Sequence, residues 1–440
     1  MMVGRLYKAR KLPATVEQNG WYETLPFPSA ARRVEGSLSA DFAVVGAGIC
    51  GLTAARRLGE LRPDASVALI EATRVGFGTS GRNAGFLLKG HSHGGEKDMA
   101  LGKRNDRLCE AGLEYIRNTV MHHQIQCQWS DWGRIYVASG APGETHLNHL
   151  ADGLEGIGTA YSTVDRDEME SITGTRFYSR GIRADGTALM QPAALMRGLG
   201  ATLPANVTLY EESPVTEIYR GDGVQLVCSE GEVQAKQAIL ANHVFAEELG
   251  IARFRVVPVS LYASLTRPLT EEELQLVGGG AEFGLLPSSP NGSTVRLTQD
   301  GRILMRNTLT YGRSKRFGAA EMATALANHR EGIRRRWPDL VDIELDGTWG
   351  GILGFTRNGG IVCGEMAPSL YAVMTTDAAP LTRGAAAAKL LAEQICGVDS
   401  ALLQDLNRLP RAALLPPDPF LRMIVNRRLH KNETAEANEL

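Results

Sequence analysis

Three glycines and one glutamate are the residues whose types and spacing point most directly to chemistry. The glycines are Gly46, Gly48 and Gly51, in the pattern Gly-x-Gly-x-x-Gly. They follow the apolar run 42–45, and Glu71 ends a second apolar run, 67–70. Residues 52–61 lie between the runs and have a helical pattern. The order strand, glycine turn, helix, strand and acid is typical of a βαβ unit that binds a dinucleotide.

Each glycine would have a separate physical role in such a unit. Gly46 lets the chain turn tightly, Gly48 leaves no Cβ between the backbone and a pyrophosphate, and Gly51 allows the helix to pack closely on the strand. Ile49 and Cys50 follow Gly48 at the helix N-terminus, where unpaired N–H groups and the positive dipole favour phosphates. An ordinary strand–helix turn is the alternative interpretation.

Glu71, with Ala72 beside it, indicates which dinucleotides fit. A carboxylate at this strand end accepts hydrogen bonds from ribose hydroxyls and repels a 2′-phosphate, which argues against NADP. An NAD-linked dehydrogenase fits Glu71 but leaves the next segment unexplained.

That segment, residues 76–85, reads GFGTSGRNAG. Its small and hydroxylated residues suit close approach to phosphate, and Arg82 offers a cation. A glycine-rich surface loop is the alternative. The segment resembles the one that follows the ribose-binding acid in the D-amino-acid-oxidase-like flavoproteins, FAD enzymes that oxidise C–N bonds. There it folds over the FAD pyrophosphate and runs beneath the isoalloxazine ring. The resemblance implies FAD contacts from Gly78, Thr79, Ser80, Arg82, Asn83, Ala84 and Gly85.

The same resemblance implies an α/β fold, in which a Rossmann-type FAD-binding domain is intertwined with an antiparallel-sheet substrate domain. It also implies that Val215 contributes backbone to the adenine end and that Ala241 and Asn242 lie beside the ADP. The expected divisions are an N-terminal arm at 1–40, an FAD-binding domain at 41–130, 185–250 and 345–400, a substrate domain at 131–184 and 251–344, and a C-terminal helix and tail at 401–440.

Two local patterns extend this prediction. Residues 127–139 alternate aromatic and polar side chains and read as a strand. The chain from His430 onward is polar, and we expect it to be disordered.

Over almost its whole length the chain looks like the gamma-glutamylputrescine oxidoreductase branch of the superfamily. Shared features include the aromatic N-terminal arm, the 76–85 segment and Trp349-Gly350-Gly351. The resemblance implies hydride transfer from the α-carbon of an amine to flavin N5, followed by hydrolysis of the imine to an aldehyde. O₂ or another acceptor would then take the electrons.

Two comparisons with the family narrow the reaction. Glycine- and D-amino-acid-oxidising members hold the substrate carboxylate with an Arg a few residues after the tryptophan, and Leu353 stands at that place here. An amine without an α-carboxylate is therefore favoured. An amino acid oxidase or dehydrogenase stays open, since Arg306 or Arg357 could serve instead. Members with covalent flavin carry a Cys near Gly351, which is missing here, so we expect non-covalent FAD.

Candidate catalytic residues are His91, His93 and Tyr262. His91 and His93 follow the flavin segment, and a histidine that titrates near neutrality suits proton transfer from an amine. A solvated loop is the alternative, and no third ligand supports a metal site. Tyr262 and Arg306 lie on expected sheet strands, whose inward face alternation alone does not identify. His243 is interpreted as structural, and Trp349 as either pocket wall or core.

One departure from the family motivates a different class of function. The family usually has a glycine-rich loop before the last helix, whereas residues 375–384 here read TTDAAPLTRG. Asp377 would disfavour an anionic reduced flavin nearby. A flavin-binding or scaffold protein with reduced or lost redox activity is therefore the second hypothesis.

Composition sets the remaining limits. The 440 residues carry a net charge of −2, with 43% hydrophobic and 22% charged residues, which gives no reason to expect nucleic acid as a partner. The six cysteines are scattered and indicate a cytoplasmic protein with reduced thiols. No signal peptide or membrane span is expected.

Overall fold

The computed structural model describes residues 7–13, 19–90, 98–289, 291–340, 342–374 and 379–435. It confirms the expected α/β class and the βαβ unit. The unit consists of β2 (Gly36–Val45), α2 (Ile49–Leu61) and β3 (Val67–Ile70). The helix begins at Ile49, earlier than its apolar pattern suggested, because Gly48 is already its N-cap.

Within the described residues, one sheet has nine strands and surrounds this unit. β2 pairs in parallel with β3 and with β12 (Gly231–Leu240), and β3 pairs in parallel with β9 (Val207–Tyr210). The remaining strands are β1 (Tyr7–Lys8), β10 (Glu217–Gly221), β11 (Gly223–Val227), β18 (Val362–Ala367) and β19 (Leu370–Met374). The buried residues of β2 and β3 form near-continuous apolar runs, as parallel strands covered on both faces require.

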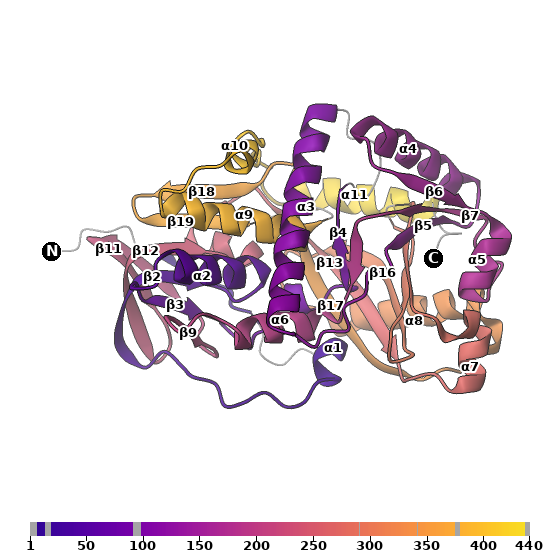
Figure 1. Ribbon diagram of the computed structural model, residues 1–440, viewed down its shortest axis with the longest axis horizontal. Coiled ribbons are helices and arrows are strands. Elements are labelled where there is room, and N and C mark those ends of the chain that lie inside the picture. Colours follow the sequence, from indigo (N-terminus) through magenta and orange to yellow (C-terminus); the bar gives the residue numbers. More distant parts are fainter. Residues whose placement is uncertain are drawn as a thin grey trace.

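A second sheet, with eight strands in the described part of the chain, forms the other half of the molecule (Figure 1). Its order is β17 (Leu345–Phe355), β13 (Val257–Thr266), β16 (Ile303–Tyr311), β15 (Thr294–Leu297), β14 (Phe283–Pro287), β5 (Arg134–Ala138), β7 (Arg180–Ala184) and β6 (Tyr161–Val164). Most neighbours are antiparallel, and only β14 and β5 run parallel. β4 (Phe86–Leu88) and β8 (Thr187–Leu189) form a separate antiparallel pair.

The chain passes several times between the two sheets, so they are intertwined as expected. β17 lies in the range that we assigned to the FAD-binding domain, yet it pairs with β13 of the eight-stranded sheet. The division of the chain into two domains with our boundaries remains a proposal.

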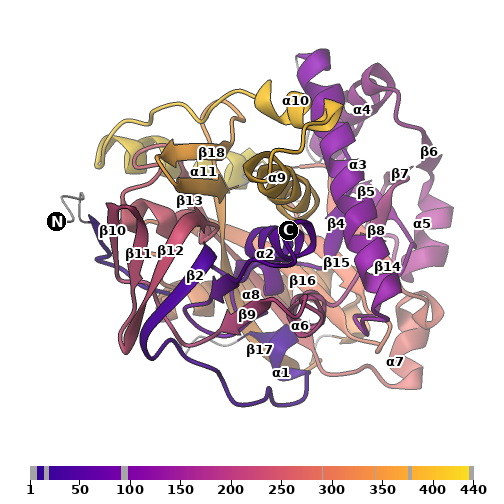
Figure 2. The same ribbon diagram turned by 60° about the vertical axis from the view of Figure 1, so that its left-hand side comes forward.

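Helices cover the nine-stranded sheet in two layers (Figure 2). α2 packs against α9 (Pro380–Ile395), and α9 packs against the long helix α3 (Met99–His122). Gly112 makes the second approach possible, because a Cβ there would lie 1.8 Å from the Thr382 carbonyl oxygen. The run Ala385–Ala388 in α9 is fully buried, since only small side chains fit between such close helices.

Eight further helices complete the described part of the fold. They are α1 (Gly20–Glu23), α4 (Ala141–Ile157), α5 (Arg166–Thr173), α6 (Pro192–Ala201), α7 (Glu271–Leu276), α8 (Ala319–Arg336), α10 (Ala401–Asn407) and α11 (Phe420–Ala435). 3₁₀ segments occupy Thr79–Gly81, His243–Leu249, Gly278–Gly280 and Pro338–Leu340.

Two local predictions were wrong. Residues 127–133 are not strand, because Gln128 and Gly133 have positive φ angles of 50° and 90°, which break an extended backbone; only β5 remains. The chain beyond His430 is not disordered throughout, because α11 continues to Ala435. Leu421, Val425 and Leu429 recur at helical spacing and face a cavity, which explains why this helix forms.

Arg296 on β15 connects the two halves. Its fully buried guanidinium forms an ion pair with Glu282 at 2.9 Å. It also donates to the carbonyl oxygens of Gly85 (3.2 Å) and Met190 (2.5 Å). The eight-stranded sheet is thereby fixed to the segment that follows β3.

Replacing Arg296 by Met should therefore destabilise the protein strongly. The variant leaves the carboxylate of Glu282 and two carbonyl oxygens in a buried place without their donor, a change that costs about 3–5 kcal/mol. Urea unfolding would measure the difference. Arg334→Met is the control, since its ion pair with Glu331 is half exposed and should contribute little. Equal losses in both variants would contradict the role of Arg296.

His329 of α8 is buried behind β13 and β16. Its Nε2 accepts from the Asn307 N–H (3.5 Å), so Nδ1 carries the proton and donates to Ser264 Oγ (2.7 Å). Burial, assisted by the charge on Arg306, lowers the pKa of His329 to about 4. The imidazole is neutral in the native state.

This lowered pKa gives a signed pH dependence. Between pH 6.5 and about 4 the unfolded chain binds a proton that the native chain excludes, so stability falls as the pH falls through this window. From pH 7 to pH 5, His329 should account for about 1–2 kcal/mol of lost unfolding free energy. His329→Gln should be less stable at pH 7 but flatter in its pH profile; an unchanged slope would contradict the assignment.

Candidate functional site

A cavity of about 1160 Å³ lies between the two sheets. It extends from the carboxyl ends of β2, β3 and β12 to the face formed by β13, β16 and β17, and α11 contributes one wall. Its volume is above the range of roughly 300–1,000 Å³ typical of pockets for one small ligand. Such a space suits an extended ligand together with a second, smaller molecule.

The glycine turn forms the nucleotide end of this cavity. Gly46 has a φ of 97°, which favours glycine, and its N–H donates to the Ile70 carbonyl oxygen at 2.7 Å. Gly48 is the N-cap of α2, and a Cβ at this position would lie 2.9 Å from Ser80 Oγ. Gly46, Gly48, Ile49 and Cys50 line the cavity. Gly51 does not: a Cβ there would lie 1.7 Å from the Gly46 carbonyl oxygen, so this glycine permits packing.

Glu71 lies at the end of β3, where the sequence predicted it. One carboxylate oxygen accepts from the Ala47 N–H (2.8 Å), and the other accepts from the N–H and hydroxyl of Thr73 (2.9 and 3.0 Å). Burial raises the pKa of Glu71, while these three donors oppose that rise. The carboxylate is thus held in one orientation, and Glu71 and Ala72 both line the cavity.

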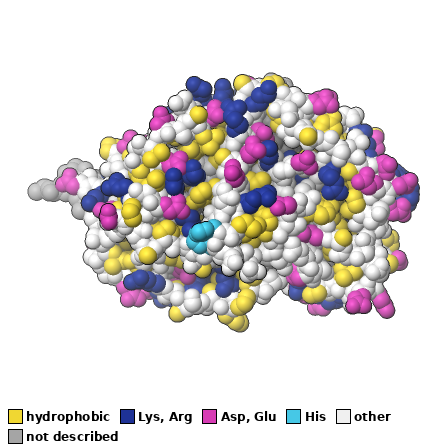
Figure 3. Space-filling model, in the orientation of Figure 1, with side chains coloured by type: hydrophobic (Ala, Val, Ile, Leu, Met, Phe, Trp, Pro, Cys, Tyr) yellow, Lys and Arg dark blue, Asp and Glu magenta, His cyan; other side chains and the backbone are white. Residues whose placement is uncertain are grey.

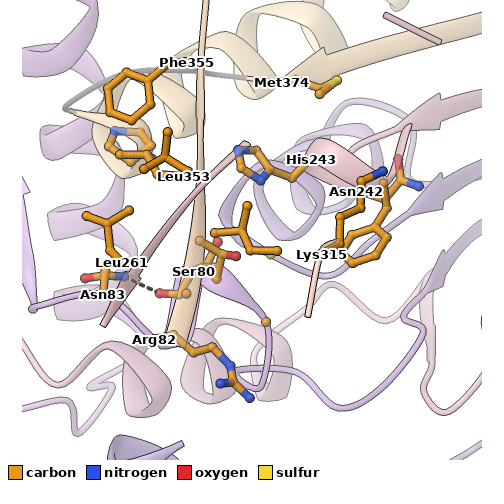
Figure 4. A pocket seen from close by; sticks show the side chains of 18 of the residues that line it. Ser80, Arg82, Asn83, Asn242, His243, Leu261, Lys315, Leu353, Phe355 and Met374 are labelled. Atoms are coloured by element: carbon orange, nitrogen blue, oxygen red, sulfur yellow. Dashed lines mark hydrogen bonds between the residues drawn. The ribbon is translucent and has the colours of Figure 1, made fainter. Parts of the chain in front are cut away.

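Residues 76–85 cross from the nine-stranded sheet to β17. Gly78, Thr79, Ser80, Arg82, Asn83 and Ala84 line the cavity. The Ile49 N–H donates to Ser80 Oγ at 3.1 Å, which places this hydroxyl at the N-terminus of α2. Asn83 donates to the Ser80 carbonyl oxygen at 2.6 Å, the contact drawn in Figure 4. Gly85 lies outside the cavity wall, against Arg296.

The Arg82 guanidinium lies against backbone carbonyl oxygens and an aromatic ring. Its guanidinium donates to the carbonyl oxygens of Phe77 (2.6 Å) and Gly350 (2.9 Å) and lies 4.7 Å from the centre of the Phe77 ring. In Figure 4 it points away from the other labelled side chains. We therefore propose that Arg82 positions the segment and does not pair with a phosphate.

Val215, Ala241 and Asn242 also line the cavity, on the side of β12. Ala241 lies against the glycine turn, since a Cβ on Gly46 would be 2.9 Å from its carbonyl oxygen. The Asn242 side-chain oxygen is buried and has no hydrogen-bond partner within the described chain. A buried amide oxygen of this kind can accept from a ligand.

His243, which we interpreted as structural, stands in the cavity wall (Figure 4). Its φ of 49° is unusual for a non-glycine residue, and its buried Nδ1 has no partner among the described residues. Burial, with a smaller effect of Lys315, lowers its pKa to about 4. The imidazole is therefore neutral at physiological pH. Lys315 itself is paired with Glu247 (2.8 Å) and Glu248 (2.7 Å).

The opposite end of the cavity is mainly apolar. Its side chains come from neighbouring strands and include Leu261, Leu309, Leu353 and Phe355. Tyr262 faces inward, donates or accepts at 2.9 Å with Thr310 and contacts Phe317 edge to face. Burial raises the pKa of Tyr262, so the phenol stays protonated at neutral pH. His91 and His93 lie outside the described residues.

Sequence reasoning missed several wall residues. Lys315, Phe317 and the α11 side chains come from segments far from the glycine turn. The spacing of Leu421, Val425 and Leu429 was a usable signal for α11, whereas nothing local marks Lys315 or Phe317. Trp349 is core and not wall: it is 1% exposed, and its indole N–H donates to the Arg82 carbonyl oxygen at 2.9 Å.

These residues fit an adenine dinucleotide. The glycine turn leaves room for a pyrophosphate, Glu71 is oriented for a ribose, and Asn242 offers an unpaired acceptor. Within the described residues, no group of three or more His, Cys, Asp or Glu side chains could hold a metal ion. In the same residues, no helix is both long and apolar enough to cross a membrane.

The surface adds no competing site on the face shown in Figure 3. Acidic and basic side chains are interspersed over most of that face, in keeping with the net charge of −2. The cavity is therefore the feature on which a functional interpretation rests.

Comparison with known proteins supports this interpretation. The family model DAO, described as FAD dependent oxidoreductase, matches residues 41–394. The probable oxidoreductase OrdL of Rhizobium meliloti (strain 1021) is 29% identical over 364 residues, which cover 80% of this chain and 82% of that protein. The gamma-glutamylputrescine oxidoreductase of Escherichia coli (strain K12) is 25% identical over 395 residues, covering 87% and 88%.

Solved structures show the same fold. Glycine oxidase from Geobacillus kaustophilus superimposes with a TM-score of 0.69 at 19% identity, over 83% of this chain and 96% of that one. L-proline dehydrogenase from P. horikoshii gives a TM-score of 0.66 at 14% identity, over 85% and 96%.

Two substitutions in the glycine turn, at Gly48 and at Gly46, should differ in their effects on FAD affinity and on folding stability. Gly48→Ala should fold normally, since its φ is −77° and the new Cβ meets only the rotatable Ser80 hydroxyl at 2.9 Å. It should nevertheless weaken FAD binding at least tenfold, or about 1.4 kcal/mol. Gly46→Ala should lower both the melting temperature of the cofactor-free protein and the affinity, because its φ is 97°.

Isothermal titration with FAD and thermal unfolding of the cofactor-free protein give the two quantities. Gly140→Ala, at the N-cap of α4, serves as the matched control and should change neither. Unchanged affinity in Gly48→Ala would mean that no pyrophosphate approaches this turn.

Proposed function

Because the chain belongs to the DAO family of FAD-dependent oxidoreductases, we propose that it oxidises the C–N bond of a primary or secondary amine. One observation carries this proposal: the glycine turn, Glu71 and the 76–85 segment share a continuous cavity wall with the apolar end of the cavity. We call that end the apolar chamber; its side chains include Leu261, Leu309, Leu353 and Phe355. A relative that covers most of the chain, the gamma-glutamylputrescine oxidoreductase, acts by its name on an amine derivative.

Bound FAD would supply the acceptor for a hydride from the amine's α-carbon. The chain would hold it through the backbone at Gly46–Cys50, the Glu71 carboxylate and the segment fixed by Arg82. Non-covalent attachment is part of the proposal. So are O₂ or another electron acceptor and a cytoplasmic location.

The side chains of the chamber would act on the amine, by favouring its neutral form and by excluding water. An amine transfers hydride only as the neutral base, and the cationic Arg306 in the wall favours that form over the ammonium ion. Leu261, Leu353 and Phe355 exclude water from the same space. The protonated Tyr262 phenol and the neutral His243 imidazole can hydrogen-bond to the substrate without adding charge.

An amino acid substrate is the second candidate, and the position of Arg306 in the cavity favours it. Leu353 does not, because it lines the cavity at the place where the family's carboxylate-binding Arg would stand. The hypothesis of a scaffold with lost redox activity rested on the loop 375–384, whose residues 375–378 lie outside the described chain. That hypothesis is separated from the others by experiment.

The purified protein should be yellow, and acid denaturation should release all of its FAD into the supernatant. Under anaerobic conditions, members of a panel of primary and N-methyl amines should bleach the bound flavin, since an oxidisable amine that fills the apolar chamber gives its hydride to the flavin. Absorbance near the flavin maximum measures both. A panel that leaves the flavin oxidised throughout would reject amine oxidation, and a colourless protein that takes up no FAD would favour the scaffold.

A further inference from the structure

Arg306 is a cationic side chain in the cavity that has no ion-pair partner among the described residues. It lies on β16 and lines the chamber. Its one hydrogen bond runs to Thr294 Oγ1 at 2.6 Å. Among the described residues, no carboxylate lies within ion-pair distance of its guanidinium, and burial alone lowers its pKa, to about 10. It is therefore still charged at neutral pH.

The other cations of the cavity wall are accounted for. Lys315 is paired with two glutamates, and Arg82 donates to two backbone carbonyl oxygens. Lys11 is exposed and donates to the Arg313 carbonyl oxygen at 2.9 Å, and Arg357 and Arg428 are exposed to solvent. The acids of the wall are Glu248, which pairs with Lys315, and Glu71, which lies at the nucleotide end. An unpaired charge away from water is costly, so the structure leaves Arg306 a place for an anion from outside the chain.

The sheet register separates this place from the position of Leu353. Arg306 pairs with Ala263, which pairs with Trp349, whereas Leu353 pairs with Val259. Arg306 thus lies two strands across from β17 and four residues along it from Leu353, a separation of about 17 Å between backbones. An anion on Arg306 would sit in a different part of the chamber from one held at the position of Leu353.

We propose that Arg306 binds a carboxylate of the substrate, so that this enzyme prefers amines that carry a carboxylate separated by several bonds from the oxidised carbon. This inference rests on the proposed function, since it names the substrate class for the same cavity. The guanidinium presents a planar fork of donors, of which Thr294 occupies one, and a carboxylate accepts from two in parallel. The apolar side chains between would cover the connecting methylene groups.

The test uses pairs of amines that differ only in the carboxylate: butylamine against 4-aminobutyrate, and pentylamine against 5-aminovalerate. With the FAD-loaded wild type, kcat/KM for flavin reduction should be about 10- to 100-fold higher for at least one carboxylated member, because a charge-assisted hydrogen bond contributes roughly 1.5–3 kcal/mol. Arg306→Gln should reduce that ratio to near one, because it lowers kcat/KM for the carboxylated amines far more than for the neutral amines. Arg306→Lys should restore part of it.

Arg357→Gln is the matched control, since Arg357 lines the same cavity but is exposed. It should leave the ratio intact. The proposal is overturned if wild type prefers the neutral amines, if Arg306→Gln keeps the ratio, or if Arg357→Gln removes it. It is also overturned if Arg306→Gln slows neutral and carboxylated amines equally, which would mean that the guanidinium acts on the flavin.

A binding measurement keeps this inference separate from the proposed function. Butyrate, which has no amine to oxidise, should perturb the absorbance of bound FAD in the wild type and should do so at least tenfold more weakly in Arg306→Gln. Butanol should not perturb the FAD absorbance of the wild type or of Arg306→Gln. If no amine reduces the flavin but butyrate binding depends on Arg306, amine oxidation fails and the anion site stands. If amines react without any dependence on Arg306, the anion site fails alone.

Discussion

The attachment of residues 76–86 to both sheets is the constraint on which the site depends. Arg82 donates to the carbonyl oxygens of Phe77 and Gly350, and the Trp349 indole N–H donates back to the Arg82 carbonyl oxygen. From below, the Trp21 indole N–H donates to the Asn83 carbonyl oxygen at 2.8 Å. Two of these bonds are buried and two are part-buried, and a buried hydrogen bond left unmade is costly, so they hold the segment in its position along the cavity.

That position explains the distribution of charge in the cavity. At the nucleotide end the chain supplies donors as backbone N–H groups, and Arg82 donates to two backbone carbonyl oxygens. Asn242 beside the glycine turn, and His243 and Arg306 farther along the wall, have incomplete hydrogen bonding among the described residues. Unpaired buried polar groups in a native structure call for a ligand, and the three lie along one continuous wall.

The strands behind the chamber show why substrate preference can change without a change of fold. β13, β16 and β17 pair over long registers, and their backbone hydrogen bonds do not depend on which side chains face inward. Leu353 and Arg306 are single inward positions on β17 and β16. A charge can therefore be absent at one position and present at another while structures of 14–19% identity keep the same architecture.

The sequence by itself determined the nucleotide half of this protein. Gly46, Gly48, Gly51 and Glu71 act within one short βαβ unit, where local turn geometry and strand ends fix each role, so spacing was enough. It also gave the fold class, through motifs that lie close together in the chain.

The chamber was decided only by the tertiary structure. Whether Tyr262, Arg306 or Trp349 faces inward depends on register, and a shift by one residue reverses every side chain. His243 lines the cavity with a φ of 49° in the 3₁₀ segment after β12, and the Arg82 guanidinium donates to the carbonyl oxygens of Phe77 and Gly350. The contact between Arg82 and Gly350 joins residues 268 positions apart, and no local pattern encodes it.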